Sequence, residues 1–356
     1  MTPGVISQLC AILRGESKDL PAGEGGERLL EMARLHRVDR LVRWRTGQVD
    51  DEARAEALLD EVHVRELNRV LASLDQRGVI PLVLKGAALA HTHYEESWLR
   101  SRIDSDVLVP ADERQTTFDV LADLGYWRPP AISGDLVTYQ AQFVRSSAGG
   151  QEHVLDVHWR VANPQLVADV ITYDELASRA CTISVRGQSM RTPCPVDALL
   201  VACVHRAAHH DDADDLLWIY DLHLIAARFT RTDWGDVVRY ASDRGVRALC
   251  VRGLEMSVER FHTVVPPDVL ERLSAVGRPL ERSSVYVKQD MRRVDRLMID
   301  LRALGPHAGV RLLWEHVMPP SDYIGAKYHV RHRALLPAFY VRRVVEGLSK
   351  WFARAG

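Results

Sequence analysis

The stretch VLKGAALAHTHYEESWLRSRIDSDVLV, residues 83–109, decides the fold of this chain. It predicts a strand that ends in Lys-Gly, a short helix, a turn that carries Arg100, and then a second strand. Side chains alternate between the two faces of a strand, so Asp104 and Asp106 are expected on one face and their neighbours on the other. The stretch therefore predicts two carboxylates side by side on one face of a small sheet.

Two neighbouring carboxylates repel each other and raise each other's pKa, so the pair is costly unless a cation lies beside it. Mg²⁺ is the expected cation, with Mn²⁺ as the second choice, because Mg²⁺ is usually held by one or two carboxylates together with substrate phosphates. An Asp-x-Asp pattern alone is also typical of any strand with one solvated face. The preceding residues favour the metal. Gly86 opens a helix whose free backbone N–H groups suit a phosphate, and Lys85 adds a positive charge.

A third strand is predicted at VLDVHWRV, residues 154–161, where apolar residues alternate with Asp156, His158 and Arg160. Three polar residues on one strand face are typical of a solvated surface when nothing else accompanies them. Beside the first motif, Asp156 is the natural third carboxylate of the same site.

Together these motifs resemble the nucleotidyltransferase-fold superfamily, and within it the family of uncharacterised bacterial nucleotidyltransferases. The family pattern is Lys-Gly, then an arginine, then Asp-x-Asp, and later Asp-x-His-Trp. The matching residues are Lys85, Gly86, Arg100, Asp104, Asp106, Asp156, His158 and Trp159. The likeness extends over most of residues 60–340, although Ala87 stands where the superfamily has a serine hydroxyl near the phosphates.

The resemblance implies an α+β fold, with a small mixed sheet flanked by helices and followed by a helical C-terminal region. We expect an N-terminal helical cap in residues 1–78, the catalytic core in residues 79–194 and the helical region in residues 195–356.

The resemblance also implies a reaction, in which an acceptor nucleophile attacks the α-phosphate of a nucleoside triphosphate, such as ATP, and pyrophosphate leaves. Asp104, Asp106 and Asp156 are the expected catalytic residues and the ligands of two Mg²⁺ ions. Asp156 is also a candidate to take the acceptor's proton. The residues expected to hold the phosphates are Lys85, Gly86, Arg100 and Arg102. His158 is expected to contact the base, the ribose or the acceptor, or to make a structural hydrogen bond.

Three functions remain open at this stage. The first is transfer of a nucleoside monophosphate to a hydroxyl, phosphate or other nucleophile on a small molecule, peptide or protein. The second makes RNA the acceptor, as in toxin-like tRNA nucleotidyltransferases, because residues 281–356 carry 14 Lys or Arg against 7 Asp or Glu. Such charges more often lie on solvated helix faces. The third is a non-catalytic nucleotide-binding module, which the replaced serine favours and the three retained carboxylates oppose.

The helical region carries His205 and His209 one turn apart, next to several aspartates, a pattern that invites a zinc site. A zinc protease needs a glutamate after the first histidine, and here Arg206 follows it. We therefore predict that His205 is buried and hydrogen-bonded to a carboxylate such as Asp221. Only the tertiary structure decides whether these side chains also line the cleft.

The five cysteines are irregularly spaced and form no Cys-x-x-Cys pair, so neither a disulfide framework nor a thiolate zinc site is indicated. No apolar run reaches membrane-spanning length, and the N-terminus lacks the features of a signal peptide. We expect a cytoplasmic protein without a membrane partner.

Overall fold

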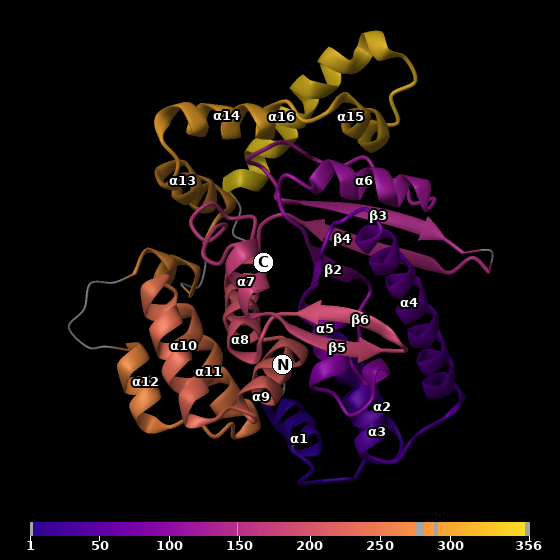
Figure 1. The fold of residues 1–356 in the computed structure, drawn as a ribbon, viewed down its shortest axis with the longest axis vertical. Coiled ribbons are helices and arrows are strands. Elements are labelled where there is room, and N and C mark those ends of the chain that lie inside the picture. The colour runs from indigo at the N-terminus through magenta and orange to yellow at the C-terminus, as the bar shows by residue number, and fades with distance from the viewer. Residues whose placement is uncertain (1–2, 148, 275–280, 288–290, 353–356) are drawn as a thin grey trace.

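The computed structural model of the chain describes residues 3–147, 149–274, 281–287 and 291–352. A four-stranded sheet lies near the centre, and helices surround it and continue to the C-terminal end (Figure 1). The predicted α+β fold, with a small sheet flanked by helices and a helical C-terminal region, is confirmed.

The central sheet has the strand order β1-β2-β4-β3. Strand β2 runs parallel to β4, and the other neighbours are antiparallel, so the sheet is mixed as predicted. Its strands are β1 (Leu82–Val83), β2 (Ser105–Leu108), β3 (Gln140–Ser146) and β4 (Glu152–His158). Strand β2 begins two residues later than the strand predicted from Ile103, which is 84% exposed and not on an apolar face.

Alternation along the strands divides the sheet into two faces. One face packs on α4 (Asp51–Asp75) and α6 (Arg114–Asp123), through an apolar cluster that includes Val107, Leu155 and Val157. The residues between these apolar side chains point to the opposite face, toward the helices that follow the sheet in sequence. Asp106 and Asp156 belong to that second face, and they are direct register partners.

The N-terminal helices α1 (Pro3–Leu13), α2 (Glu24–Leu35) and α3 (Asp39–Arg45) precede α4. The helical pattern over residues 26–46 predicts a single helix, but the chain breaks at Arg37, whose φ of 56° is incompatible with a right-handed helix. Residues of α1–α3 share one apolar cluster with helices of the later region. The division into three domains stays a prediction.

The helical region after the sheet forms a bundle beside it (Figure 1). The helical pattern over residues 233–261 predicts one helix, but the chain turns at Gly245, with a φ of 64°, and two helices form instead. The sequence also predicts a helix over residues 268–276, which is observed as α12 (Pro267–Ser274), and residues 275 and 276 lie outside the described residues. The elements are α7 (Tyr173–Arg179), α8 (Pro195–Val204), the π-helical turn η2 (His205–His209), α9 (Leu216–Ala226), α10 (Arg231–Asp243), α11 (Arg247–Phe261) and α12 (Pro267–Ser274).

A β-hairpin that we did not predict lies between α7 and α8 in the chain, with strands β5 (Cys181–Val185) and β6 (Gln188–Thr192). Its two-residue turn is Arg186-Gly187, and both residues have positive φ, 54° and 80°. Two-residue hairpin turns of this kind match the twist of the strands. The Arg-Gly pair between two runs of alternating residues was the available signal.

The last helices lie at one end of the molecule, next to α6 and β3 (Figure 1). The carboxylate of Glu315 anchors them, because it accepts backbone N–H groups of residues 135, 136 and 137 at 3.0, 2.9 and 2.9 Å. One or two helices were predicted after residue 310. The elements are η3 (Arg282–Val287), α13 (Arg293–Ala303), α14 (Pro306–Val317), α15 (Ser321–Tyr328), η4 (Arg333–Leu335) and α16 (Leu336–Phe352). Within the described residues no helix combines the length and apolar character needed to cross a bilayer.

Candidate active site

The first part of the site is the junction of β1 and α5 (Lys85–Thr92). Lys85 has a φ of 47°, in the left-handed region, which costs a non-glycine residue about 1–3 kcal/mol. Its Nζ lies 2.7 Å from Asp106 Oδ1, and the two side chains are nearly buried. The strained residue thus neutralises a carboxylate of the neighbouring strand β2.

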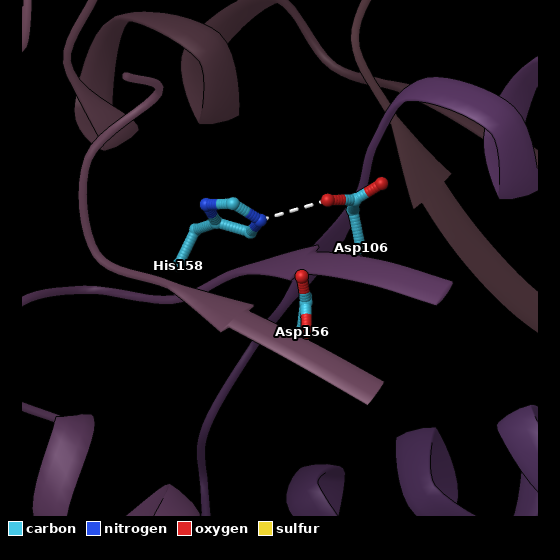
Figure 2. Close-up of side chains that lie close together, drawn as sticks. All are labelled: Asp106, Asp156 and His158. Atoms are coloured by element: carbon cyan, nitrogen blue, oxygen red, sulfur yellow. Dashed lines mark hydrogen bonds and ion pairs between the residues drawn. The ribbon is translucent and has the colours of Figure 1, made fainter. Parts of the chain in front are cut away.

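Asp106, Asp156 and His158 form the centre of the site, and Figure 2 shows them rising from the same face of β2 and β4. One ligand atom from each residue lies within 4.8 Å of those of the other two. His158 Nε2 is 2.8 Å from Asp106 Oδ1. Parallel pairing places the two aspartates opposite each other, and the period of two along β4 places His158 beside Asp156.

The charge on Asp106 is stabilised by its neighbours. Burial alone would raise its pKa, but Lys85 and the hydrogen bond with His158 outweigh burial and hold the pKa below its usual range. Burial, with Lys85 adding to it, lowers the pKa of His158, so its ring is neutral near pH 7. The neutral ring donates its Nε2–H to Asp106 Oδ1, the same oxygen that Lys85 contacts.

Asp156 has the opposite balance. Burial and then the charge of Asp106 raise the pKa of its carboxyl. Its Oδ2 accepts the side-chain N–H of Gln140 at 3.3 Å. Among the described residues, its buried Oδ1 has no hydrogen-bond partner. An orphaned carboxylate oxygen beside a second carboxylate is the arrangement that a hard divalent cation satisfies. The residues present therefore fit Mg²⁺ or Mn²⁺.

Asp104 lies just before β2, half-buried, and borders the same cavity. Burial and then Asp106 and Asp156 raise its pKa to about 6. The three residues whose ligand atoms lie within 4.8 Å of one another are Asp106, Asp156 and His158. Asp104 is not one of them. Its role as a metal ligand stays a prediction. The position of His158 was visible in the sequence, because it follows Asp156 by two residues on one strand.

Arg100 and Arg102, predicted to hold phosphates, both have carboxylate partners. Arg100 is buried and donates Nε and Nη2 to the two oxygens of Asp221, at 2.9 and 2.7 Å. Tyr94 Oη donates to the same carboxylate at 2.7 Å. Arg102 pairs with Asp60 of α4. Both positive charges are neutralised within the protein, and the predicted phosphate contacts of these arginines stay predictions.

Two further expectations concern Gly86 and His205. A Cβ atom on Gly86 would lie 3.4 Å from Arg100 Nη1, so the glycine lets the start of α5 approach the buried guanidinium.

The predicted hydrogen bond between His205 and Asp221 is wrong. Asp221 bonds Arg100 and Tyr94, whereas His205 Nε2 lies 3.3 Å from His210 Nε2. A bidentate arginine satisfies a buried carboxylate better than a neutral imidazole does.

A cavity of about 610 Å³ lies between the sheet and the helical bundle. It falls within the size range of small-molecule sites. Its lining includes Asp104, Asp106 and Asp156 as well as residues of η2 and α9. The question left open by the sequence is thereby answered, because His205, His209 and Asp221 all line the cavity.

Two carboxylates on adjacent parallel strands, beside a Lys-Gly helix start and facing a helical region, define the nucleotidyltransferase class of fold and site. The chain belongs to the family described as "uncharacterised nucleotidyltransferase", whose sequence model matches residues 26–262, more than half of the chain. The predicted family is thereby confirmed.

Among solved structures, the chain is similar to an antigenic nucleotidyltransferase-like protein from Paracoccidioides brasiliensis. The identity is 14%, the match covers 56% of this chain and 96% of that chain, and the TM-score is 0.33. No curated protein matches the sequence.

Proposed function

We propose that this protein is a metal-dependent nucleotidyltransferase. It moves a nucleoside monophosphate from a nucleoside triphosphate to a nucleophile on a small molecule, peptide or protein, and releases pyrophosphate. One observation carries the proposal. Asp106 and Asp156 lie side by side next to Lys85, and the buried Oδ1 of Asp156 has no hydrogen-bond partner in the described part of the chain.

In this proposal Asp106 and Asp156 hold Mg²⁺ or Mn²⁺, and Asp104 completes the set of carboxylates. The bound cation supplies Lewis-acid stabilisation of the charge that develops on the transferred phosphoryl group. His158 fixes the orientation of Asp106 through its Nε2–H. The His158 hydrogen bond therefore has a positioning role here.

The chain's remaining polar groups act on the two substrates. When the nucleotide binds, the amino group of Lys85 leaves Asp106 and contacts a phosphate oxygen. The backbone N–H groups at the start of α5 bind the same phosphate. Asp156 accepts the proton of the attacking nucleophile, a role worth about 10²–10⁴-fold in rate.

The RNA acceptor remains the second candidate, and the structure supplies little for it. Several arginines that make residues 281–356 basic are paired with carboxylates: Arg292 with Asp295, Arg296 with Asp211, Arg311 with Asp135 and Glu315, and Arg342 with Glu346. Paired surface arginines are typical of solvated helix faces. We therefore place a small molecule, peptide or protein first.

Binding is tested by thermal melting of the full chain with and without MgCl₂ and each nucleoside triphosphate. Selective binding raises the melting temperature by mass action. Transfer is tested with α-³²P-labelled nucleotides and cell extract, by asking which fraction carries the label. Asp106→Asn is expected to abolish labelling, whereas Asp112→Asn, at an exposed position outside the cavity, keeps it.

Each outcome has a defined meaning. Label in RNA supports the second candidate, and its loss with increasing salt would reflect phosphate contacts. Nucleotide binding without any transfer supports a non-catalytic module. The absence of a melting shift with every metal and nucleotide contradicts the proposed function.

A further inference from the structure

Four aromatic rings line the same cavity as the carboxylates. His205, His209 and His210 come from the π-helical turn η2 and the residue after it, and Trp218 comes from α9. All four side chains are half-buried and line the cavity. The function proposed above does not use any of them.

The π-helical turn is what aligns these rings. In an α-helix, residues five apart are rotated by about 140° about the axis, so His205 and His210 would point in different directions. The i→i+5 hydrogen bonding of a π-helical turn widens the turn and reduces this angle, and such turns are frequent at functional sites. The two ring centroids here lie 4.5 Å apart. In a regular α-helix, His205 and His210 would not both face the cavity.

The surroundings hold the rings in place. The His210 and Trp218 centroids are 4.1 Å apart with an angle of 34° between the rings, and the guanidinium of Arg37 lies 4.3 Å from the Trp218 centroid. His209 Nε2 accepts the backbone N–H of Asn163 at 2.9 Å. The wall is therefore largely preformed.

The three imidazoles are uncharged near neutral pH. Burial, with Lys85 adding to it, lowers the pKa of His209 to about 3 and that of His210 to about 4, and the pKa of His205 also falls well below its ordinary value. Neutral rings do not attract phosphates, but they stack on flat uncharged rings. The cavity therefore has a charged end, where Lys85 lies among the carboxylates proposed to hold the cation, and a neutral aromatic wall that feels the charge of Lys85.

We propose that this wall, His205, His209, His210 and Trp218, binds the nucleobase of the nucleoside triphosphate by ring stacking. The inference rests on the proposed function, which requires a ligand with a polyanionic end and a flat ring. A nucleoside triphosphate is the class of ligand that matches both ends of this one cavity. Stacking of a base on aromatic side chains typically corresponds to about a 10- to 100-fold change in affinity on truncation.

The test is isothermal titration calorimetry on the full chain with MgCl₂ and two ligands. One is an α,β-methylene nucleoside triphosphate, which cannot react, and the other is inorganic tripolyphosphate, which has no base. His210→Ala and Trp218→Leu are expected to weaken nucleotide binding by about 10- to 100-fold and to leave tripolyphosphate binding unchanged. His307→Ala, exposed on α14, is the matched control.

Unchanged nucleotide affinity in both wall variants overturns the inference, as does an equal loss for both ligands. Retained tripolyphosphate binding shows that a variant is folded. A wild-type protein that binds neither ligand contradicts the proposed function itself, and the inference falls with it. If the wild type binds both ligands, the variants test the role of the aromatic wall independently of the proposed function.

Discussion

At the scale of single residues, the most informative side chain is Lys85. It has a strained backbone conformation, and its amino group contacts Asp106 in the cavity that Asp104 and Asp156 also line. The charge of Lys85 thus neutralises the same carboxylate that the proposed cation would bind. Three carboxylates crowded in one cavity would otherwise repel each other.

The first prediction follows from that contact. Lys85→Gln is expected to lower the free energy of unfolding by about 3–5 kcal/mol in EDTA, because it leaves a buried carboxylate without its charged partner. MgCl₂ should restore much of the loss, since the cation then neutralises the same groups. Urea unfolding with EDTA and with MgCl₂ measures both values. Lys18→Gln, at an exposed position, is the control, and an equal loss under both conditions would contradict the prediction.

The second prediction concerns Arg100, which the sequence assigned to phosphates and the structure pairs with Asp221. Arg100→Lys cannot reproduce the two parallel hydrogen bonds, so we expect a loss of about 3–5 kcal/mol in unfolding free energy. Asp221→Asn should cost a similar amount, and the double variant less than the sum of both. Tripolyphosphate affinity of folded Arg100→Lys should remain that of the wild type. A clear loss of that affinity at unchanged stability would return Arg100 to a phosphate-binding role.

At the scale of elements, a largely buried carboxylate, Asp300, attaches helix α13 to the loop that carries Gln165. Asp300 accepts the backbone N–H of Gln165 at 2.8 Å, and burial raises its pKa to about 6. In the unfolded chain an aspartate has a pKa of about 3.9. The folded chain therefore binds more protons than the unfolded chain between these two values, and stability falls as pH rises through this window.

The third prediction uses this difference in pKa. Asp300→Asn keeps an oxygen that accepts the Gln165 N–H but carries no charge. The variant should melt at a higher temperature than the wild type above about pH 6 and at a similar temperature near pH 4. Melting curves of both proteins from pH 4 to pH 8 supply the measurement. A difference that stays constant across this range would show that Asp300 does not titrate as inferred.

At the scale of the whole molecule, one apolar cluster joins regions that the sequence divided. It includes Leu9 of α1, Leu84 next to the sheet, Leu200 of α8 and Tyr286 of η3. The buried pair of Arg100 and Asp221 crosses the same boundary. Helices that precede the sheet in the sequence and helices that follow it therefore both pack in the core that supports it.

The fourth prediction follows from this shared core. A fragment of residues 79–194, the predicted catalytic core, should not fold alone, because it would expose apolar surface that helices on both sides now cover. Near-ultraviolet circular dichroism and amide NMR dispersion of the fragment would show this, with the full chain as the reference. A cooperatively folded fragment would support the three-domain division instead.

Much of the site could be predicted from the sequence, because its signals are local. Alternation along the third strand placed Asp156 and His158 on one face, and Lys-Gly marked the start of α5. The β5–β6 hairpin was missed although Arg186-Gly187 offered a turn signal. The break at Arg37 had no signal, since its left-handed conformation is unusual for an arginine.

The sequence by itself determined the residue types of the site, because strand and helix periods act over a few neighbouring residues, and its motifs indicated the α+β class and the family through resemblance. Only the tertiary structure decided that Asp106 lies opposite Asp156, that Arg100 binds Asp221, and that His210 turns toward His205. The first two are contacts between segments far apart in the chain, and the third depends on a π-helical turn within a helix. Strand pairing, ion pairing and helix widening are settled by which arrangement satisfies all buried groups at once, and no local pattern encodes that.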